Sequence, residues 1–197
     1  MIKGYGLCGT HATGKTTVAE DVAKELGINF IATKTTDVYK KFKVSPQNVL
    51  DPQLRMAIQW DILDQATSLW KGQFEPWITD RTPLDFMAYV VNDSFVWEDE
   101  WYMEYLSYKY ECMSAYRKYF SKVFLIQPDG VIWERDSSLK GRNSRVLQES
   151  MNTVFKGLLT EADENSYNVI RADASSAEKK IEVFDSILQE LHCKGKE

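Results

Sequence analysis

Short apolar runs alternate along this chain with longer stretches in which apolar residues recur every three to four positions. The first such stretch places Val18 and Val22 on one helical face, and Gly27 follows as a natural C-terminal stop. Asp51 followed by Pro52 is typical of a helix N-terminus. The pattern predicts helices over 14–26, 52–70, 83–91, 97–120, 146–161 and 177–191, and strands over 2–8, 29–32, 76–79, 122–127 and 167–171.

This alternation of strands and helices predicts an α/β fold with a parallel sheet covered on both faces. The segment 33–45 is polar and basic, and we assign no element to it. No repeat or linker interrupts the pattern, so we expect one domain over 1–197. In such folds ligands bind outside the carboxyl ends of the strands. Gly9 and Asp80 both follow predicted strands, so we expect them to share one cleft.

Composition narrows the class of protein. Hydrophobic residues make up 44% of the 197 positions, as in ordinary globular domains. The net charge of −5 argues against a global positive field that would attract nucleic acid. Three cysteines without zinc spacing are typical of reduced thiols. The chain shows no signal sequence and no run approaching ~20 apolar residues, so we expect a soluble, cytoplasmic protein.

The stretch GTHATGKTT at 9–17 follows a predicted strand and opens a predicted helix, in the pattern GxxxxGK[ST]. Glycines let the backbone curl until several N–H groups point at phosphate oxygens, and the helix N-terminus adds partial positive charge. Lys15 would reach the β- and γ-phosphates, and the Thr16 hydroxyl would hold Mg²⁺. The residues predicted to bind the nucleotide are Gly9, Thr10, His11, Ala12, Thr13, Gly14, Lys15, Thr16 and Thr17.

Within this loop, His11 either touches phosphate or only shapes the loop, and we favour the second interpretation. Asp80 and Arg81 stand at the end of another predicted strand. A carboxylate there can accept a proton or bind magnesium, and an arginine can contact a phosphate or a sugar hydroxyl. The alternatives are a surface ion pair or a helix cap. For Asp85, one turn further on, we favour a solvated helix face.

The stretch 134–145 combines Arg135, Lys140, Arg142 and Arg145 around one glycine. Its position after the fourth strand favours a mobile lid that closes over the donor phosphates and excludes water, with Arg135 and Arg142 as catalytic candidates. An exposed charged loop is the alternative.

The acceptor should be held by residues that follow the second and third strands. An amide such as Gln59 can hydrogen-bond a base edge, and an aromatic ring such as Trp60 can stack on one. A buried helix stripe would explain the aromatic and aliphatic positions equally well. The substrate candidates are Lys34, Asp37, Gln59, Trp60 and Arg81, with Thr35, Tyr39 and Asp61 beside them.

The GTHATGKTT loop and the TDRTPLD segment together resemble the P-loop nucleoside and nucleotide kinases, which include thymidylate, deoxynucleoside and nicotinamide riboside kinases. The sequence is most similar to AAA-like ATP-binding kinases of bacteria and phages. The resemblance implies a P-loop NTPase fold with a five-stranded sheet in the order of nucleoside monophosphate kinases, a short arginine-rich lid, and ATP and Mg²⁺ as cofactors. By analogy Asp80 is the base or magnesium-side carboxylate, and Arg81 steadies substrate or phosphate. Thr-Pro follows this pair, where thymidylate kinases have Tyr.

Three functions stay open at this stage. The first is transfer of the γ-phosphate of ATP to a nucleoside or (deoxy)nucleoside monophosphate. The second is a phage-type kinase acting on 5-hydroxymethyluracil in DNA, which would need a basic groove and an extruded base. The third, ranked last, is a non-kinase NTPase. We expect a small-molecule partner, leave a homodimer open, and expect DNA only under the second function.

Overall fold

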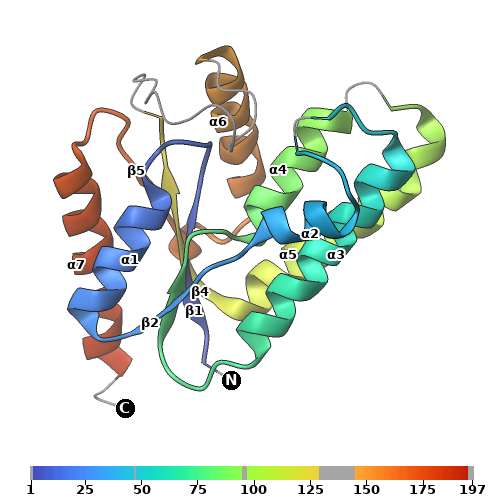
Figure 1. Cartoon of the computed structure of the whole chain (residues 1–197). Coiled ribbons are helices and arrows are strands. Elements are labelled where there is room, and N and C mark those ends of the chain that lie inside the picture. The colour runs from blue at the N-terminus through green and yellow to red at the C-terminus, as the bar shows by residue number, and fades with distance from the viewer. Residues whose placement is uncertain (1, 47, 95–96, 129–144, 195–197) are drawn as a thin grey trace.

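The computed structural model describes residues 2–46, 48–94, 97–128 and 145–194. Within this part of the chain, five parallel strands form one sheet in the order β2-β3-β1-β4-β5. The first strand, β1, therefore lies at the centre (Figure 1). This confirms the predicted fold class and strand order. The strands are β1 (Gly4–Cys8), β2 (Asn29–Ile31), β3 (Trp77–Thr79), β4 (Phe120–Ile126) and β5 (Tyr167–Ile170).

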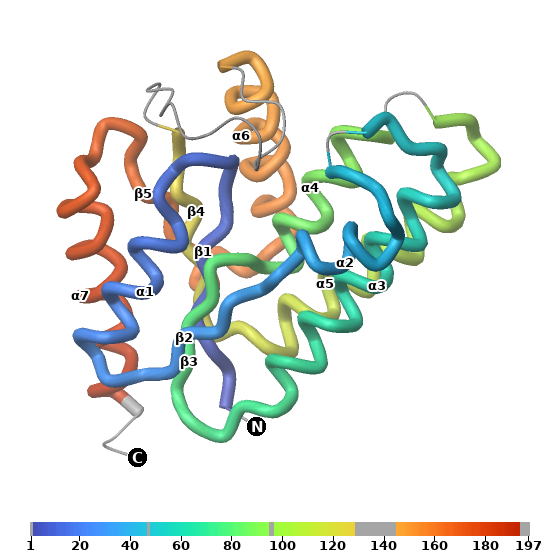
Figure 2. Tube along the Cα trace, in the orientation of Figure 1, coloured from blue at the N-terminus to red at the C-terminus, as the bar shows by residue number. Residues whose placement is uncertain are grey.

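Helices cover both faces of the sheet, as the tube in Figure 2 shows. Helices α1 and α7 pack together on one face, and α3 to α6 form the thicker layer on the other. Two short 3₁₀ turns, Asp99–Trp101 and Glu164–Ser166, precede α5 and β5. The helices are α1 (Lys15–Leu26), α2 (Thr35–Lys41), α3 (Pro52–Lys71), α4 (Pro83–Ser94), α5 (Tyr102–Tyr119), α6 (Arg145–Leu159) and α7 (Ser176–Lys194).

Successive residues of β1 face opposite sides of the sheet, and the two sides are packed differently. Tyr5 and Leu7 join the cluster under α1 and α7. On the opposite face β1 presents Gly4, where an added Cβ would lie 2.2 Å from ring atoms of Trp77. The fully buried Trp77 ring packs edge-on against Phe120, with centroids 5.4 Å apart. The missing side chain on β1 thus makes room for large aromatic residues of its two neighbouring strands.

Sequence signals at several helix ends are confirmed. The Asp51 side chain accepts a hydrogen bond from the backbone N–H of Leu54, with Pro52 as the first helical residue of α3. Gly27 ends α1 with φ 66°, a left-handed conformation that favours glycine.

One helix was missed and the bounds of another were wrong. Helix α2 lies in the segment to which we assigned no element, because its lysines obscure a short apolar face made by the buried Val38 and Tyr39. The predicted helix 97–120 begins only at Tyr102 and ends at Tyr119. Phe120 already belongs to β4 and pairs with Gly4 of β1. No Gly or Pro marks this helix-to-strand change, so only the pairing with β1 decides it.

We predict that Gly4→Ala lowers the free energy of unfolding by about 1–3 kcal/mol, because a methyl group must displace the Trp77 ring. Gly157→Ala in α6 is the matched control. No heavy atom lies within 4 Å of its added Cβ, so alanine there should be neutral or stabilise by up to about 1 kcal/mol. Urea unfolding of both variants measures this. An unchanged midpoint for Gly4→Ala would contradict the close packing.

Candidate active site

The phosphate loop joins the carboxyl end of β1 to the N-terminus of α1. Its backbone takes positive φ at Gly9 (137°), Ala12 (59°) and Gly14 (85°). An added Cβ at Gly9 would lie 2.4 Å from the carbonyl oxygen of Ile126, so the backbones of the loop and of β4 can be this close only because residue 9 has no side chain. These conformations curl the backbone as an anion-binding loop requires.

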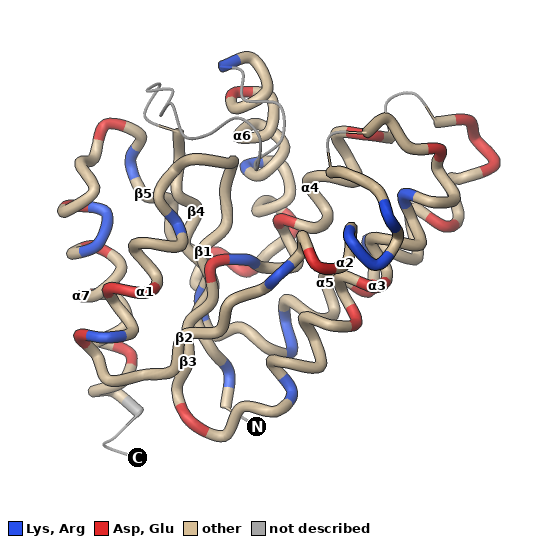
Figure 3. Tube along the Cα trace, viewed as in Figure 1, with Lys and Arg blue, Asp and Glu red and all other residues tan. Residues whose placement is uncertain are grey.

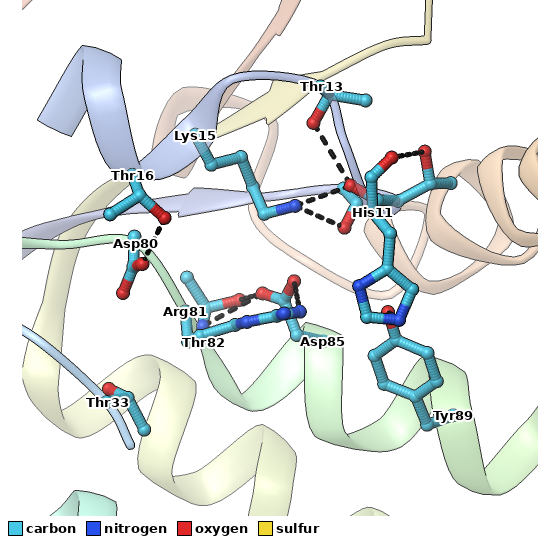
Figure 4. A network of polar contacts seen from close by, with 12 residues as sticks. His11, Thr13, Lys15, Thr16, Thr33, Asp80, Arg81, Thr82, Asp85 and Tyr89 are labelled. Carbon is cyan, nitrogen blue, oxygen red and sulfur yellow. Dashed lines mark hydrogen bonds and ion pairs between the residues drawn. The ribbon is translucent and has the colours of Figure 1, made fainter. Parts of the chain in front are cut away.

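Lys15, the first residue of α1, is buried. Its ammonium donates hydrogen bonds to the carbonyl oxygens of Gly9 (2.8 Å) and Thr10 (2.6 Å), shown as dashed lines in Figure 4. Burial lowers the pKa of Lys15 to about 8, and the positive charge of Arg81 acts in the same direction. The ammonium therefore lies inside the loop, where phosphate oxygens would compete with the two carbonyl groups for it.

Thr16 and Asp80 meet at the carboxyl edge of the neighbouring strands β1 and β3. The Thr16 hydroxyl donates to Asp80 Oδ2 at 2.6 Å. Oδ1 of Asp80 is buried and, among the described residues, has no hydrogen-bond partner. Adjacent hydroxyl and carboxylate oxygens are the kind of ligands that Mg²⁺ prefers. The two residues therefore offer oxygen ligands that would fit a magnesium ion. No cluster of three or more His, Cys, Asp or Glu residues suited to a metal occurs in the described part of the chain.

Arg81, Thr82 and Asp85 form a connected group at the start of α4. Oδ2 of Asp85 accepts hydrogen bonds from the backbone N–H of Thr82 (2.9 Å) and from its hydroxyl (3.0 Å). Oδ1 of Asp85 lies 3.4 Å from a terminal nitrogen of the Arg81 guanidinium. Asp85 thus accepts from both donors of Thr82, which supplies one half of a capping box, and it also contacts the arginine.

The interpretation of Asp85 as a solvated residue was wrong, because its side chain is fully buried. Helix α4 packs against α3, α5 and α6, so a polar residue in its first turn does not face water. Burial raises the pKa of Asp85, although the charges of Arg81 and Lys15 oppose that shift. The spacing of Thr82 and Asp85 was the sequence signal that could have identified this cap.

His11 of the loop contacts α4 through a residue that the sequence analysis did not consider. Its Nε2 is 2.8 Å from the hydroxyl oxygen of Tyr89, four residues beyond Asp85. The backbone carbonyl of His11 accepts a hydrogen bond from Gln148 of α6 at 3.4 Å. The loop is therefore connected to two helices of the thicker layer.

The substrate candidates do not all gather at this site. Gln59 is buried, with its Oε1 3.4 Å from the hydroxyl of Tyr108. The Trp60 indole N–H donates to Glu104 at 2.5 Å. Both side chains therefore connect α3 to α5, as the buried-stripe alternative would have it. Thr35 begins α2. Lys34 and Asp37 lie exposed at this helix, where Asp37 pairs with Lys40.

The remaining candidates are placed as follows. The hydroxyl of Tyr39 accepts a hydrogen bond from Arg55, which also pairs with Asp93 of α4. Asp61 accepts a hydrogen bond from Lys41 at 2.7 Å. Arg145 is the exposed first residue of α6. Of the predicted lid at 134–145, residues 134–144, which include Arg135 and Arg142, lie outside the described residues.

The sequence model of the AAA domain family AAA_28 matches residues 5–179, which include the loop and the Asp80 segment. The chain belongs to this AAA domain family. No curated protein sequence matches it.

Solved structures extend this assignment at the level of fold. NadR in complex with NR is similar with a TM-score of 0.74 and 11% identity, over 95% of this chain. The match covers 51% of NadR, so the chain spans about half of that protein. Deoxyadenosine kinase of M. mycoides with bound dCTP has a TM-score of 0.64 and 15% identity, over 96% of this chain and 99% of the kinase.

A third structure, YorR of Bacillus subtilis in complex with phosphorylated GDP, has a TM-score of 0.55 and 14% identity, covering 96% and 98% of the two chains. The AAA domain therefore has the fold of P-loop kinases. No helix in the described part of the chain has the length and apolarity needed to cross a membrane.

We predict that ATP binding at pH 9 takes up about one proton per site, because Lys15 is largely neutral above its lowered pKa and phosphate oxygens favour its charged form. The uptake should be large between about pH 8 and the ordinary lysine value of 10.5, and small at pH 7. Titration calorimetry in two buffers of different ionisation enthalpy measures it. Lys15→Met should abolish the uptake, and identical heats for the wild type in both buffers at pH 9 would contradict the assignment.

Proposed function

We propose that this protein is a kinase that transfers the γ-phosphate of ATP to a nucleoside or (deoxy)nucleoside monophosphate. The observation that carries the proposal is the contact between Thr16 and Asp80, at 2.6 Å. It brings the phosphate loop together with a carboxylate and an arginine from the neighbouring strand end. The similar structures are complexes with NR, dCTP and phosphorylated GDP, which supports a nucleoside or nucleotide ligand.

In this proposal the loop N–H groups and Lys15 hold the donor phosphates. Thr16 and Asp80 would hold Mg²⁺, which neutralises charge on the phosphate oxygens when it is bound. Oδ1 of Asp80 is buried and has no hydrogen-bond partner among the described residues, so it is suited to accept the proton of an acceptor hydroxyl. With a nucleoside the hydroxyl oxygen bonds to the γ-phosphorus, and with a monophosphate a phosphate oxygen does, as the bond to the ADP oxygen breaks.

Arg81 is the group that favours transfer over simple hydrolysis. It stands next to Asp80, and its guanidinium contacts both Asp85 and Tyr89. A fixed guanidinium is suited to bind a phosphate or sugar hydroxyl of a second substrate in two-pronged fashion. A water molecule needs no such binding group.

The distribution of charged residues gives no specific support to DNA as the acceptor. Basic and acidic residues are interspersed over the elements in view in Figure 3. Two lysines of α2 are also paired with carboxylates, Lys40 with Asp37 and Lys41 with Asp61. We therefore include DNA in the test only as a competing acceptor.

The decisive assay supplies ATP labelled at the γ-phosphate, with Mg²⁺, to separate reactions containing nucleosides, nucleoside monophosphates, plain DNA or DNA with 5-hydroxymethyluracil. We expect label on a nucleoside or monophosphate. Label only on modified DNA would replace our acceptor with a DNA base. Label found only as free phosphate with every acceptor would refute the kinase proposal.

We predict that Asp80→Asn lowers kcat by about 10²–10⁴-fold, because the amide cannot accept the acceptor proton. The dissociation constant for ATP without magnesium should stay within about threefold, since the loop and Lys15 are retained. Asp64→Asn, at an exposed carboxylate of α3, is the control and should leave kcat unchanged. Steady-state kinetics and calorimetry provide the two measurements. Near-normal turnover of Asp80→Asn would show that another group accepts the proton.

A further inference from the structure

Tyr89 of α4 lies between the phosphate loop and Arg81. Its hydroxyl oxygen is 2.8 Å from Nε2 of His11, and the two ring centroids are 5.2 Å apart. The guanidinium carbon of Arg81 is 6.0 Å from the centroid of the Tyr89 ring, at the limit of a cation–π contact. One side chain therefore contacts both the donor loop and the arginine assigned to the second substrate (Figure 4).

Helical spacing gives Arg81 two supports. Asp85 and Tyr89 are four residues apart, so they share one face of α4. The carboxylate of Asp85 lies 3.4 Å from the guanidinium, and the Tyr89 ring lies against it. A displacement of the Tyr89 ring would remove one support and let the guanidinium turn about the other.

The Lys15 ammonium has two alternative sets of hydrogen-bond partners, the loop carbonyl groups and the donor phosphates. The ammonium of Lys15 bonds to the carbonyl oxygens of Gly9 and Thr10, the two residues directly before His11. Donor phosphates would draw the ammonium away from both carbonyl groups, so the peptide units next to His11 would change partners. Two such arrangements, each favoured by a different ligand state, are what coupling between sites requires.

We propose that the hydrogen bond between His11 and Tyr89 couples the phosphate loop to Arg81, so that binding of the donor orients the arginine for the second substrate. The inference rests on the proposed function, and it makes Tyr89 a positioning residue that acts through Arg81. Burial raises the pKa of Tyr89, and the nearby Arg81 charge only partly offsets this. The phenol therefore keeps its proton at neutral pH and remains available for the bond.

Tyr89→Phe separates this coupling from simple packing. Phenylalanine keeps the ring near Arg81 and removes the hydroxyl, which reaches His11 and also interacts with the Arg81 guanidinium. If Tyr89 served packing alone, the change would leave the site unaltered. Tyr116→Phe is the matched control, because it removes a phenol hydroxyl that bonds to Ser166 at 2.7 Å, outside the candidate site.

The first experiment needs no acceptor and uses AMP-PNP with Mg²⁺ as the donor probe. Hydrogen exchange followed by mass spectrometry compares peptides of the loop and of α4 with and without the probe. In the wild type and in Tyr116→Phe we expect slower exchange in both segments. In Tyr89→Phe we expect protection of the loop to persist and protection of α4 to be lost. Equal protection of α4 in Tyr89→Phe and wild type, or none in the wild type, would overturn the coupling.

The second experiment is a double-mutant cycle measured with the acceptor that the labelling assay identifies. His11→Phe should lower kcat about fivefold, the effect of losing one hydrogen bond, and Tyr89→Phe at least as much, while the KM for ATP stays within about twofold. The double variant should lose no more than Tyr89→Phe alone, because that change already removes the bond to His11. Additive losses would show that the two residues act separately.

The two proposals fail in different ways. Free phosphate as the only labelled product would refute the kinase, whereas the exchange experiment would still test whether donor binding reaches α4. Transfer to an acceptor with unchanged kinetics in Tyr89→Phe would leave the kinase standing and refute the coupling.

Discussion

The parallel pairing of β1 with β3 is the constraint on which the candidate site depends. The pairing aligns Gly6 with Thr79, so the residues that follow these strands emerge at the same edge of the sheet. Thr16 and Asp80, 64 positions apart in the chain, meet there at 2.6 Å. The pairing in turn requires that β1 lack a side chain at Gly4, where the Trp77 ring packs. Strand β1 therefore contributes both to the packing of the core and to the geometry of the site.

Charge balance is the second organising feature. Lys15 and Arg81 supply two cations, and Asp80 and Asp85 supply two carboxylates in the same neighbourhood. Burial works against charge on Lys15 and on Asp85, so each needs the opposite charges around it. The Lys15 ammonium meanwhile bonds to loop carbonyl groups, which phosphate oxygens can replace. A buried cation with exchangeable partners suits a site that binds and releases an anionic donor.

The sequence predicted the fold wherever the signal was local. The glycine loop, the Asp51 cap and the Gly27 stop depend on contacts within a few residues, and the structure agrees with them. Prediction failed where distant packing decided. Phe120 is a strand residue because β1 pairs with it, and Asp85 is buried because three helices surround α4. Tyr89 carried no local signal, since its partner His11 is 78 positions away.

By itself the sequence determined that this chain forms a curled glycine loop between a strand and a helix, because backbone curvature and helix capping are properties of short segments. It also supplied Asp80 and Arg81 at a strand end. Only the tertiary structure decided that Thr16 and Asp80 touch and that Asp85 fixes Arg81. It likewise placed Gln59 and Trp60 between α3 and α5. The reason is physical: strand order and helix packing determine which distant side chains share a buried space.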